Sequence, residues 1–148
     1  MSGKPLSDYK LNILCSYAYS SGAEQFKSVK TVSPLFNFIL DSGGFTNYWQ
    51  KIRKAAYGKA TRSPIELKKY IEYCLQLEDE LYGYIALDMP RNPELTLENL
   101  ERMVKVGLSP MPVFAEGVDY KTLPELIEIN DRLCVAGSVQ SSDRYTIQ

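Results

Sequence analysis

The stretch Phe38-Ile39-Leu40-Asp41-Ser42-Gly43-Gly44-Phe45 decides how this chain folds. An apolar run ends abruptly on an acid, and two glycines follow. The pattern predicts a buried strand that delivers a carboxylate to its C-terminal end and then turns sharply, since glycine accepts positive φ and lets the backbone approach a ligand. In α/β proteins, sites are built at that end of a strand. Asp41, Ser42, Gly43 and Gly44 are therefore the first candidate site residues.

Four further apolar segments have the character of strands, so the expected strands cover residues 11–19, 36–41, 82–88, 111–116 and 132–138. The segments at 82–88 and 111–116 also end in an acid. Helical patterns are expected at residues 23–32, 46–59, 63–81, 92–106 and 120–129, and Ser63, Pro64 and Glu66 predict a capping box for the third of these. Alternating strands and helices predict parallel strands joined by right-handed crossovers.

The fold class is α/β, and we expect a (β/α) barrel of the TIM type. Neither a dinucleotide-binding glycine motif nor a P-loop occurs in the sequence, which disfavours the open doubly wound sheet. Five strands make up about five eighths of a barrel of ~250 residues, so the barrel is partial. Two strand edges and part of the interior would then be open.

Composition predicts one ordinary globular domain over residues 1–148, with 45% hydrophobic residues, 24% charged residues and a net charge of −1. Without an apolar run of ~18 residues or a secretory signal, we expect a cytoplasmic protein, or one of the host cytoplasm if a phage encodes it. The chain has no histidine, which leaves carboxylates as the first acid–base candidates. Cys15, Cys74 and Cys134 are expected to be reduced core thiols.

The Asp41-Ser42-Gly43-Gly44-Phe45 motif resembles the hallmark of the tRNA-guanine transglycosylase family, an aspartate followed by Ser-Gly-Gly-aromatic. Ile85-Ala86-Leu87-Asp88 looks like the family's second base-recognising aspartate. Val113-Phe114-Ala115-Glu116-Gly117 looks like its glutamine-bearing strand, and Val135-Ala136-Gly137-Ser138 resembles its glycine-bearing strand. Leu14-Cys15-Ser16-Tyr17-Ala18-Tyr19 is similar to the bacterial and phage branch that inserts 7-deazaguanine into DNA.

The resemblance implies base exchange in DNA or tRNA. A carboxylate attacks the anomeric carbon of a flipped-out nucleotide, guanine leaves, and a 7-deazaguanine then takes the sugar from the glycosyl-enzyme. It gives Asp41 an acid–base role and Asp88 the recognition of the base. Ser42, Gly43, Gly44 and Glu116 would bind substrate, as would the backbone of Gly137 and Ser138. The polymer and the identity of the deazapurine stay open.

Three departures from the family pattern stand out. Glu116 occupies the position of an amide, and an ionised acid cannot donate a hydrogen bond as an amide can. The family's nucleophile and its zinc site would both lie beyond residue 148, so no cofactor or metal is expected in this chain. The nucleophile would come from a C-terminal continuation, from a second polypeptide, or from Glu116 or Asp143.

A different class of function is a non-catalytic base-binding or partner module, a half-barrel completed by a second copy or a second chain. A third reading, an unrelated barrel enzyme for a small carbonyl or phosphate substrate, lacks the lysine or phosphate loop that it needs at a strand end.

For two groups of side chains the sequence allows both a binding role and a purely structural role. Four aromatic residues could either stack on a base or belong to the core: Tyr17, Tyr19, Phe45 and Tyr48. Trp49 is expected to pack in the core. The chain also has one basic stretch, which is expected either to contact phosphates or to form a solvated helix face. It comprises Lys51, Arg53, Lys54, Lys59 and Arg62.

Overall fold

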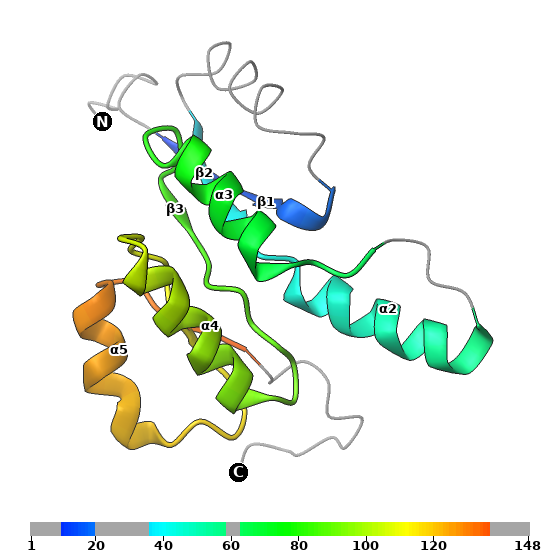
Figure 1. Cartoon of the computed structure of the whole chain (residues 1–148). Coiled ribbons are helices and arrows are strands. Elements are labelled where there is room, and N and C mark those ends of the chain that lie inside the picture. The colour runs from blue at the N-terminus through cyan, green and yellow to red at the C-terminus, as the bar shows by residue number, and fades with distance from the viewer. Residues whose placement is uncertain (1–9, 20–35, 59–62, 137–148) are drawn as a thin grey trace, which may run out of the picture.

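The computed structural model describes residues 10–19, 36–58 and 63–136 (Figure 1). The elements in chain order are β1 (Leu11–Ser16), η2 (Tyr17–Tyr19), β2 (Phe36–Asp41), α2 (Gly44–Tyr57), α3 (Leu67–Leu77), β3 (Gly83–Tyr84), α4 (Pro93–Lys105), β4 (Val113–Phe114), η3 (Tyr120–Thr122), α5 (Leu123–Ile129) and β5 (Cys134–Val135). The helix expected at 23–32 lies outside the described residues. So do Lys59, Arg62, Gly137, Ser138 and Asp143.

All described strand pairs are parallel, and neighbouring strands follow one another along the chain. The order β1-β2-β3 forms one sheet and β4-β5 another. A parallel bridge between Ile85 and Met111 joins the two, with the amide of Ala86 donating to the carbonyl of Met111 at 2.9 Å. The predicted α/β class with parallel strands is therefore confirmed for the part of the chain that the structure describes.

One face of the strands is covered by α3, α4 and α5 (Figure 1). The long apolar side chains of these helices recur every three or four residues, so each helix has a single apolar stripe to bury. They meet strand residues in one cluster of buried side chains: Leu40, Tyr70, Tyr73, Cys74, Leu77, Tyr84, Ala86, Leu87, Leu100, Met103, Leu108 and Leu126. This cluster is the main core, and it fixes where the strand ends lie.

The opposite face of the sheet is less covered. Side chains alternate across a strand, so Ile39 and Asp41 lie on the face opposite Leu40. Leu14, the register partner of Ile39, is 63% exposed. The prediction of a buried first strand over residues 11–19 is thus wrong. Strand β1 ends at Ser16 and is followed by the 3₁₀ turn η2. It lies at the edge of its sheet and pairs with β2 alone among the described strands.

The start of α3 also differs from the prediction. The helix begins at Leu67, its N-cap position is Glu66, and no capping-box hydrogen bond forms. The side chain of Asn47 in α2 forms hydrogen bonds with both backbone groups of Ile65. It accepts from the amide at 3.2 Å and donates to the carbonyl at 3.5 Å. Those bonds hold the segment before α3 extended, and Glu66 pairs with Lys69 at 2.8 Å instead.

The ends of α4 and the start of α5 show which local sequence signals fix the limits of a helix. The Asn92 side chain caps α4 by accepting from the amide of Leu95 at 3.0 Å, and Gly107 has the positive φ expected after the helix end. Pro124 lies within the helix expected at 120–129. It stands in the first turn of α5, where a missing amide costs nothing, so it starts that helix. No helix among the described residues has the length and apolar character to span a membrane.

Two buried tyrosines of α3 provide a matched test of this core. The Tyr70 hydroxyl donates to the carbonyl of Ile85 at 2.6 Å, whereas the Tyr73 hydroxyl has no hydrogen-bond partner among the described residues. We expect Tyr70→Phe to lower the free energy of unfolding by about 1–3 kcal/mol, because it removes the hydroxyl that donates to the partly buried carbonyl of Ile85. Tyr73→Phe should be neutral or stabilising. Urea unfolding of both variants measures this, and equal losses would contradict the assigned hydrogen bond.

Candidate functional site

The turn after β2 gathers its own polar groups around the two glycines. Gly43 has φ 77° and lies against Ala18 and Ile65, where a Cβ atom would come within 2.8 and 2.9 Å of their side chains. Its amide donates to Oδ2 of Asp41 at 3.2 Å, and the amide of Gly44 donates to Oγ of Ser42 at 3.2 Å. Both amides, predicted to meet a ligand, are thus used inside the turn in this conformation.

Ser42 joins the two strand ends. Its hydroxyl, fully buried, donates to Oδ1 of Asp88 at 2.9 Å. Gly44 comes so close to Asp88 that a Cβ on it would lie 2.2 Å from both the carbonyl and Oδ1 of that residue. Asp41 and Asp88, each expected to end an apolar strand, therefore lie near each other, although β3 itself ends before Asp88. The arrangement depends on the absence of a side chain at position 44.

Helix α4 fixes the backbone on either side of Asp88. The Asn99 side chain donates to the carbonyl of Leu87 at 2.9 Å, and the Thr96 hydroxyl accepts from the amide of Met89 at 2.9 Å. Both side chains are buried. Sequence reasoning missed them, although the signal was there: Thr96 and Asn99 share a helical stripe with Leu100 and Met103, so two polar residues fall on an apolar face.

Burial and charge both act on Asp88. Loss of hydration is the largest cause, and it raises the pKa of this carboxyl. The hydrogen bond from Ser42 opposes that shift, and the negative charge of Asp41 adds to it. Burial, and after it the negative charges of the same two aspartates, raise the pKa of the Cys134 thiol on β5. Side chains from β2, from β5 and from the segment after β3 therefore lie near one another.

Within the described part of the chain, no polar contact joins the remaining predicted site residues to the two aspartates. Glu116 is exposed, makes no polar contact within the described ranges, and its role stays a prediction. Gly137 and Ser138 fall outside those ranges. Cys74 is the buried thiol that was expected, whereas Cys15 and Cys134 are half-buried. No group of three metal-binding side chains gathers among the residues that the structure describes.

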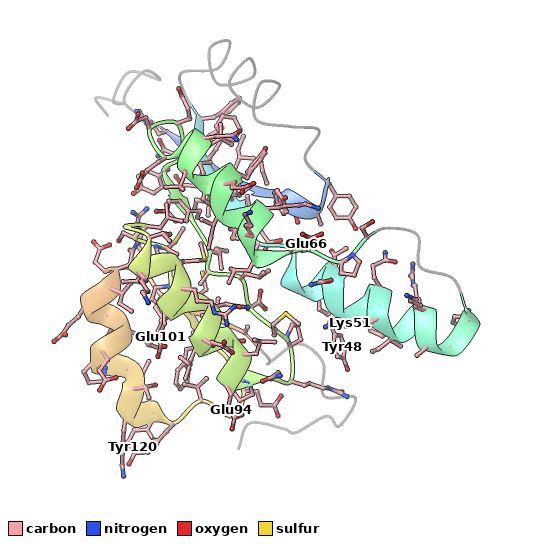
Figure 2. All side chains as sticks on the ribbon, viewed as in Figure 1. Tyr48, Lys51, Glu66, Glu94, Glu101 and Tyr120 are labelled. Atoms are coloured by element: carbon pink, nitrogen blue, oxygen red, sulfur yellow. The ribbon has the colours of Figure 1, made fainter. Side chains whose placement is uncertain are left out.

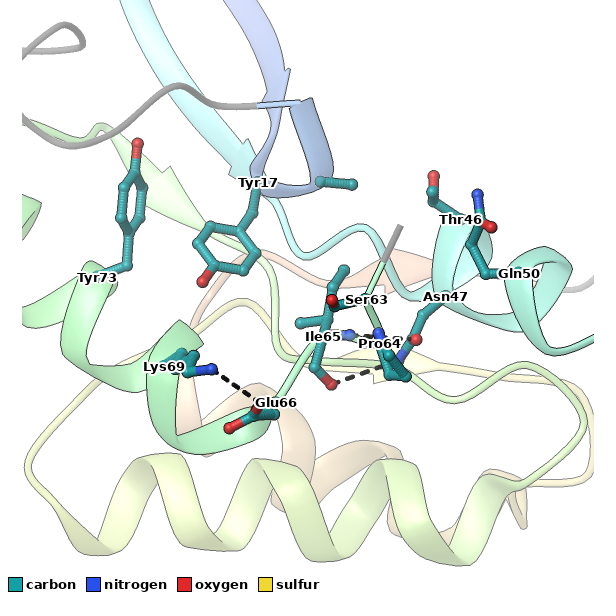
Figure 3. Close-up of a pocket in the computed structure, with 11 residues that line it drawn as sticks. Tyr17, Thr46, Asn47, Gln50, Ser63, Pro64, Ile65, Glu66, Lys69 and Tyr73 are labelled. Atoms are coloured by element: carbon teal, nitrogen blue, oxygen red, sulfur yellow. Dashed lines mark hydrogen bonds and ion pairs between the residues drawn. The ribbon is translucent and has the colours of Figure 1, made fainter. Parts of the chain in front are cut away.

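A separate pocket of about 360 Å³ lies behind the glycine turn, between η2, α2 and α3 (Figure 3). Tyr17 and Tyr73 form one side of it, Thr46 and Gln50 the other. Lys69 and Glu66, which line it, form the ion pair described above. Neither Asp41 nor Asp88 lines this pocket, so it is not the place where the two carboxylates would meet a ligand.

Comparison of the chain with protein-family models, with curated proteins and with solved structures gave no match. Assignment of a function therefore depends on the residues and geometry given above.

The glycine turn can be tested with Gly43→Ala. The new methyl would meet Ala18 and Ile65 in addition to the strain of a left-handed backbone, so we expect a loss of about 2–4 kcal/mol in the free energy of unfolding. Gly58→Ala is the matched control, because Gly58 has φ 67° and nothing within 4 Å. It should cost about 1 kcal/mol. Chemical denaturation of both variants measures the difference, and equal losses would exclude close packing at Gly43.

The raised pKa of Asp88 makes stability depend on pH. The folded state holds this proton more tightly than the unfolded state, so wild-type stability is lost as pH rises through the raised pKa. Asp88→Asn, which keeps an oxygen for Ser42, removes the titration. We expect the free energy of unfolding of this variant, minus that of the wild type, to increase from about pH 3 to pH 7.

Denaturation curves across that pH range measure the difference. Glu101→Gln, on the exposed side of α4 (Figure 2), is the control for simple loss of a carboxylate. A difference for Asp88→Asn that stays flat or falls with rising pH would contradict the assigned shift.

Proposed function

We propose that this chain carries the base-binding part of a transglycosylase that exchanges guanine for a 7-deazaguanine in a nucleic acid. The observation that supports this most is the Ser42 hydroxyl, which donates to Asp88 while its neighbour Asp41 lies beside the same strand end. Two acids held at neighbouring strand ends in a partly dehydrated setting suit recognition of a purine and transfer of a proton.

The chemistry of the base matches these groups. The edge of guanine that pairs with cytosine offers two N–H donors side by side, and an ionised carboxylate accepts both. In this proposal Asp88 accepts from that edge. Asp41 gives a proton to guanine as the glycosidic bond breaks and takes one from the incoming base as the new bond forms.

Base exchange also requires an attacking carboxylate. In the first step the bond between the anomeric carbon and guanine breaks, a bond from that carbon to a carboxylate oxygen forms, and the proton from Asp41 passes to the base. We assign the attacking group to a later strand of a (β/α) barrel whose first strands are β1 to β5. Their parallel pairing in chain order supports a barrel of this kind.

A second candidate is a non-catalytic module that binds a base or a partner chain. The face of β1 and β2 away from the helices favours it, because Leu14 is exposed there and an apolar sheet face is normally covered. In that case a second copy or another chain would complete the barrel.

Calorimetric titration of the purified chain with guanine and with a 7-deazaguanine tests the proposed pocket. We expect saturable binding to wild type, and a loss of at least about tenfold in affinity for Asp88→Ala and for Asp41→Ala, since each removes a hydrogen-bond partner of the base. Glu101→Ala should bind as wild type does. Equal binding by all three variants, or none by a folded wild type, would exclude a base pocket formed by this chain alone.

A further inference from the structure

Helix α2 carries large apolar side chains that are exposed to solvent, namely Phe45, Trp49 and Tyr57. It begins at Gly44, beside Asp88, and its second half, Arg53–Tyr57, is exposed throughout. In Figure 1 it runs away from the strands and lies beside no other helix that the structure describes. A helix in this position leaves a surface that begins at the proposed site and extends outward.

Aromatic rings occupy the first two turns of that surface. Phe45 is 47% exposed and Trp49 is 41% exposed, and their ring centroids are 6.0 Å apart at an interplanar angle of 79°. Tyr48 is 6.1 Å from Trp49 in a similar edge-to-face arrangement. Phe45 and Trp49 are one helical turn apart, so they share a face. Exposed rings of this kind offer π-faces on which nucleobases stack.

Positive charge accompanies the rings. Helix α2 contains Lys51, Arg53 and Lys54 and no acidic residue. All three are exposed, and none forms an ion pair with a described residue. Figure 2 shows Tyr48 and Lys51 on the same side of the helix. The whole chain has a net charge of −1, so this helix is a local concentration of positive charge against the general balance.

A fourth cation links this helix to the site. Arg91 lies three residues after Asp88 and has φ 63°, the one positive value outside glycine among the described residues. Its guanidinium carbon lies 5.7 Å from the centre of the Tyr48 ring. The loop after β3 thus adds a cation beside the ring of Tyr48, in the first half of α2.

We propose that α2, together with Arg91, binds a single-stranded stretch of nucleic acid, with bases stacked on Phe45 and Trp49 and phosphates on Lys51, Arg53, Lys54 and Arg91. The inference deepens the proposed function, since it names the polymer next to the base pocket. Three cations on a helix without acidic residues complement phosphates, and exposed rings complement unpaired bases, so a nucleic acid matches both features of this surface.

The test uses single-stranded DNA and RNA oligonucleotides of about 12 nucleotides. Trp49 is the only tryptophan in the chain, so stacking on it is expected to quench the intrinsic fluorescence. Anisotropy of a labelled oligonucleotide gives the affinity of each variant at several salt concentrations. Trp49→Ala should weaken binding about tenfold or more, through loss of one stacked base.

The triple variant Lys51→Gln, Arg53→Gln, Lys54→Gln should lower the slope of log affinity against log salt by about 2. Its charge-matched control replaces Lys68, Lys105 and Lys121, exposed residues on other elements, by glutamine. The control should leave the slope unchanged. Equal effects of the two triple variants would overturn the proposal, and so would binding without quenching of Trp49.

Other occupants give different outcomes, each of which overturns the inference. Trp49 emission that shifts to the blue with protein concentration, together with dimers in sedimentation, would assign the helix to a second copy. A shift with phosphatidylserine vesicles and none with oligonucleotides would assign it to a membrane surface. Guanine titrated in parallel separates the two proposals: base binding without oligonucleotide binding overturns this inference alone, and the reverse overturns the base pocket alone.

Discussion

The contact between the Ser42–Gly44 turn and Asp88 is the constraint on which the rest of the site depends. Gly44 lies too close to Asp88 for any side chain at position 44, and Ser42 fills the remaining space with a hydroxyl that both donates and accepts. Two strand ends that carry acids would otherwise repel each other. The hydroxyl, and the helix polar groups behind it, hold Asp88 where burial raises its pKa.

The two faces of the strands have different roles: the face covered by helices holds the core, and the open face carries Asp41. On the helix side, α3 and α4 meet Leu40 and Tyr84 in a continuous apolar core, with Tyr70 bonded to the strand backbone. On the open side are Asp41 and the less covered apolar residues of β1 and β2. Stability is therefore concentrated behind the sheet. This leaves the acid-bearing edge available for a ligand, as is common for sites at strand ends.

The two proposals use adjoining parts of one surface. The aspartates suit the polar edge of a base, whereas α2 and Arg91 suit the bases and phosphates that would flank it in a strand. Helix α2 starts at Gly44, the residue that lies against Asp88, so the two proposed surfaces adjoin each other there. A helix that leaves its apolar face in solvent lowers stability, and a ligand stacked on that face would offset the loss.

The sequence by itself determined the limits of β2, because an apolar run that stops at an acid and glycines encodes them locally. The alternation of strand and helix patterns also predicted the parallel pairing that the described strands show. The sequence also predicted the end of α4 near Gly107, but it left the cap of this helix open between Asn92-Pro93 and Thr96, and the structure shows Asn92 there. Only the tertiary structure decided the start of α3, where Asn47 from another helix competes for the backbone of Ile65. The internal use of the glycine amides, the roles of Thr96 and Asn99, and the exposure of Trp49 likewise depend on which elements are neighbours in space, and local pattern does not carry that information.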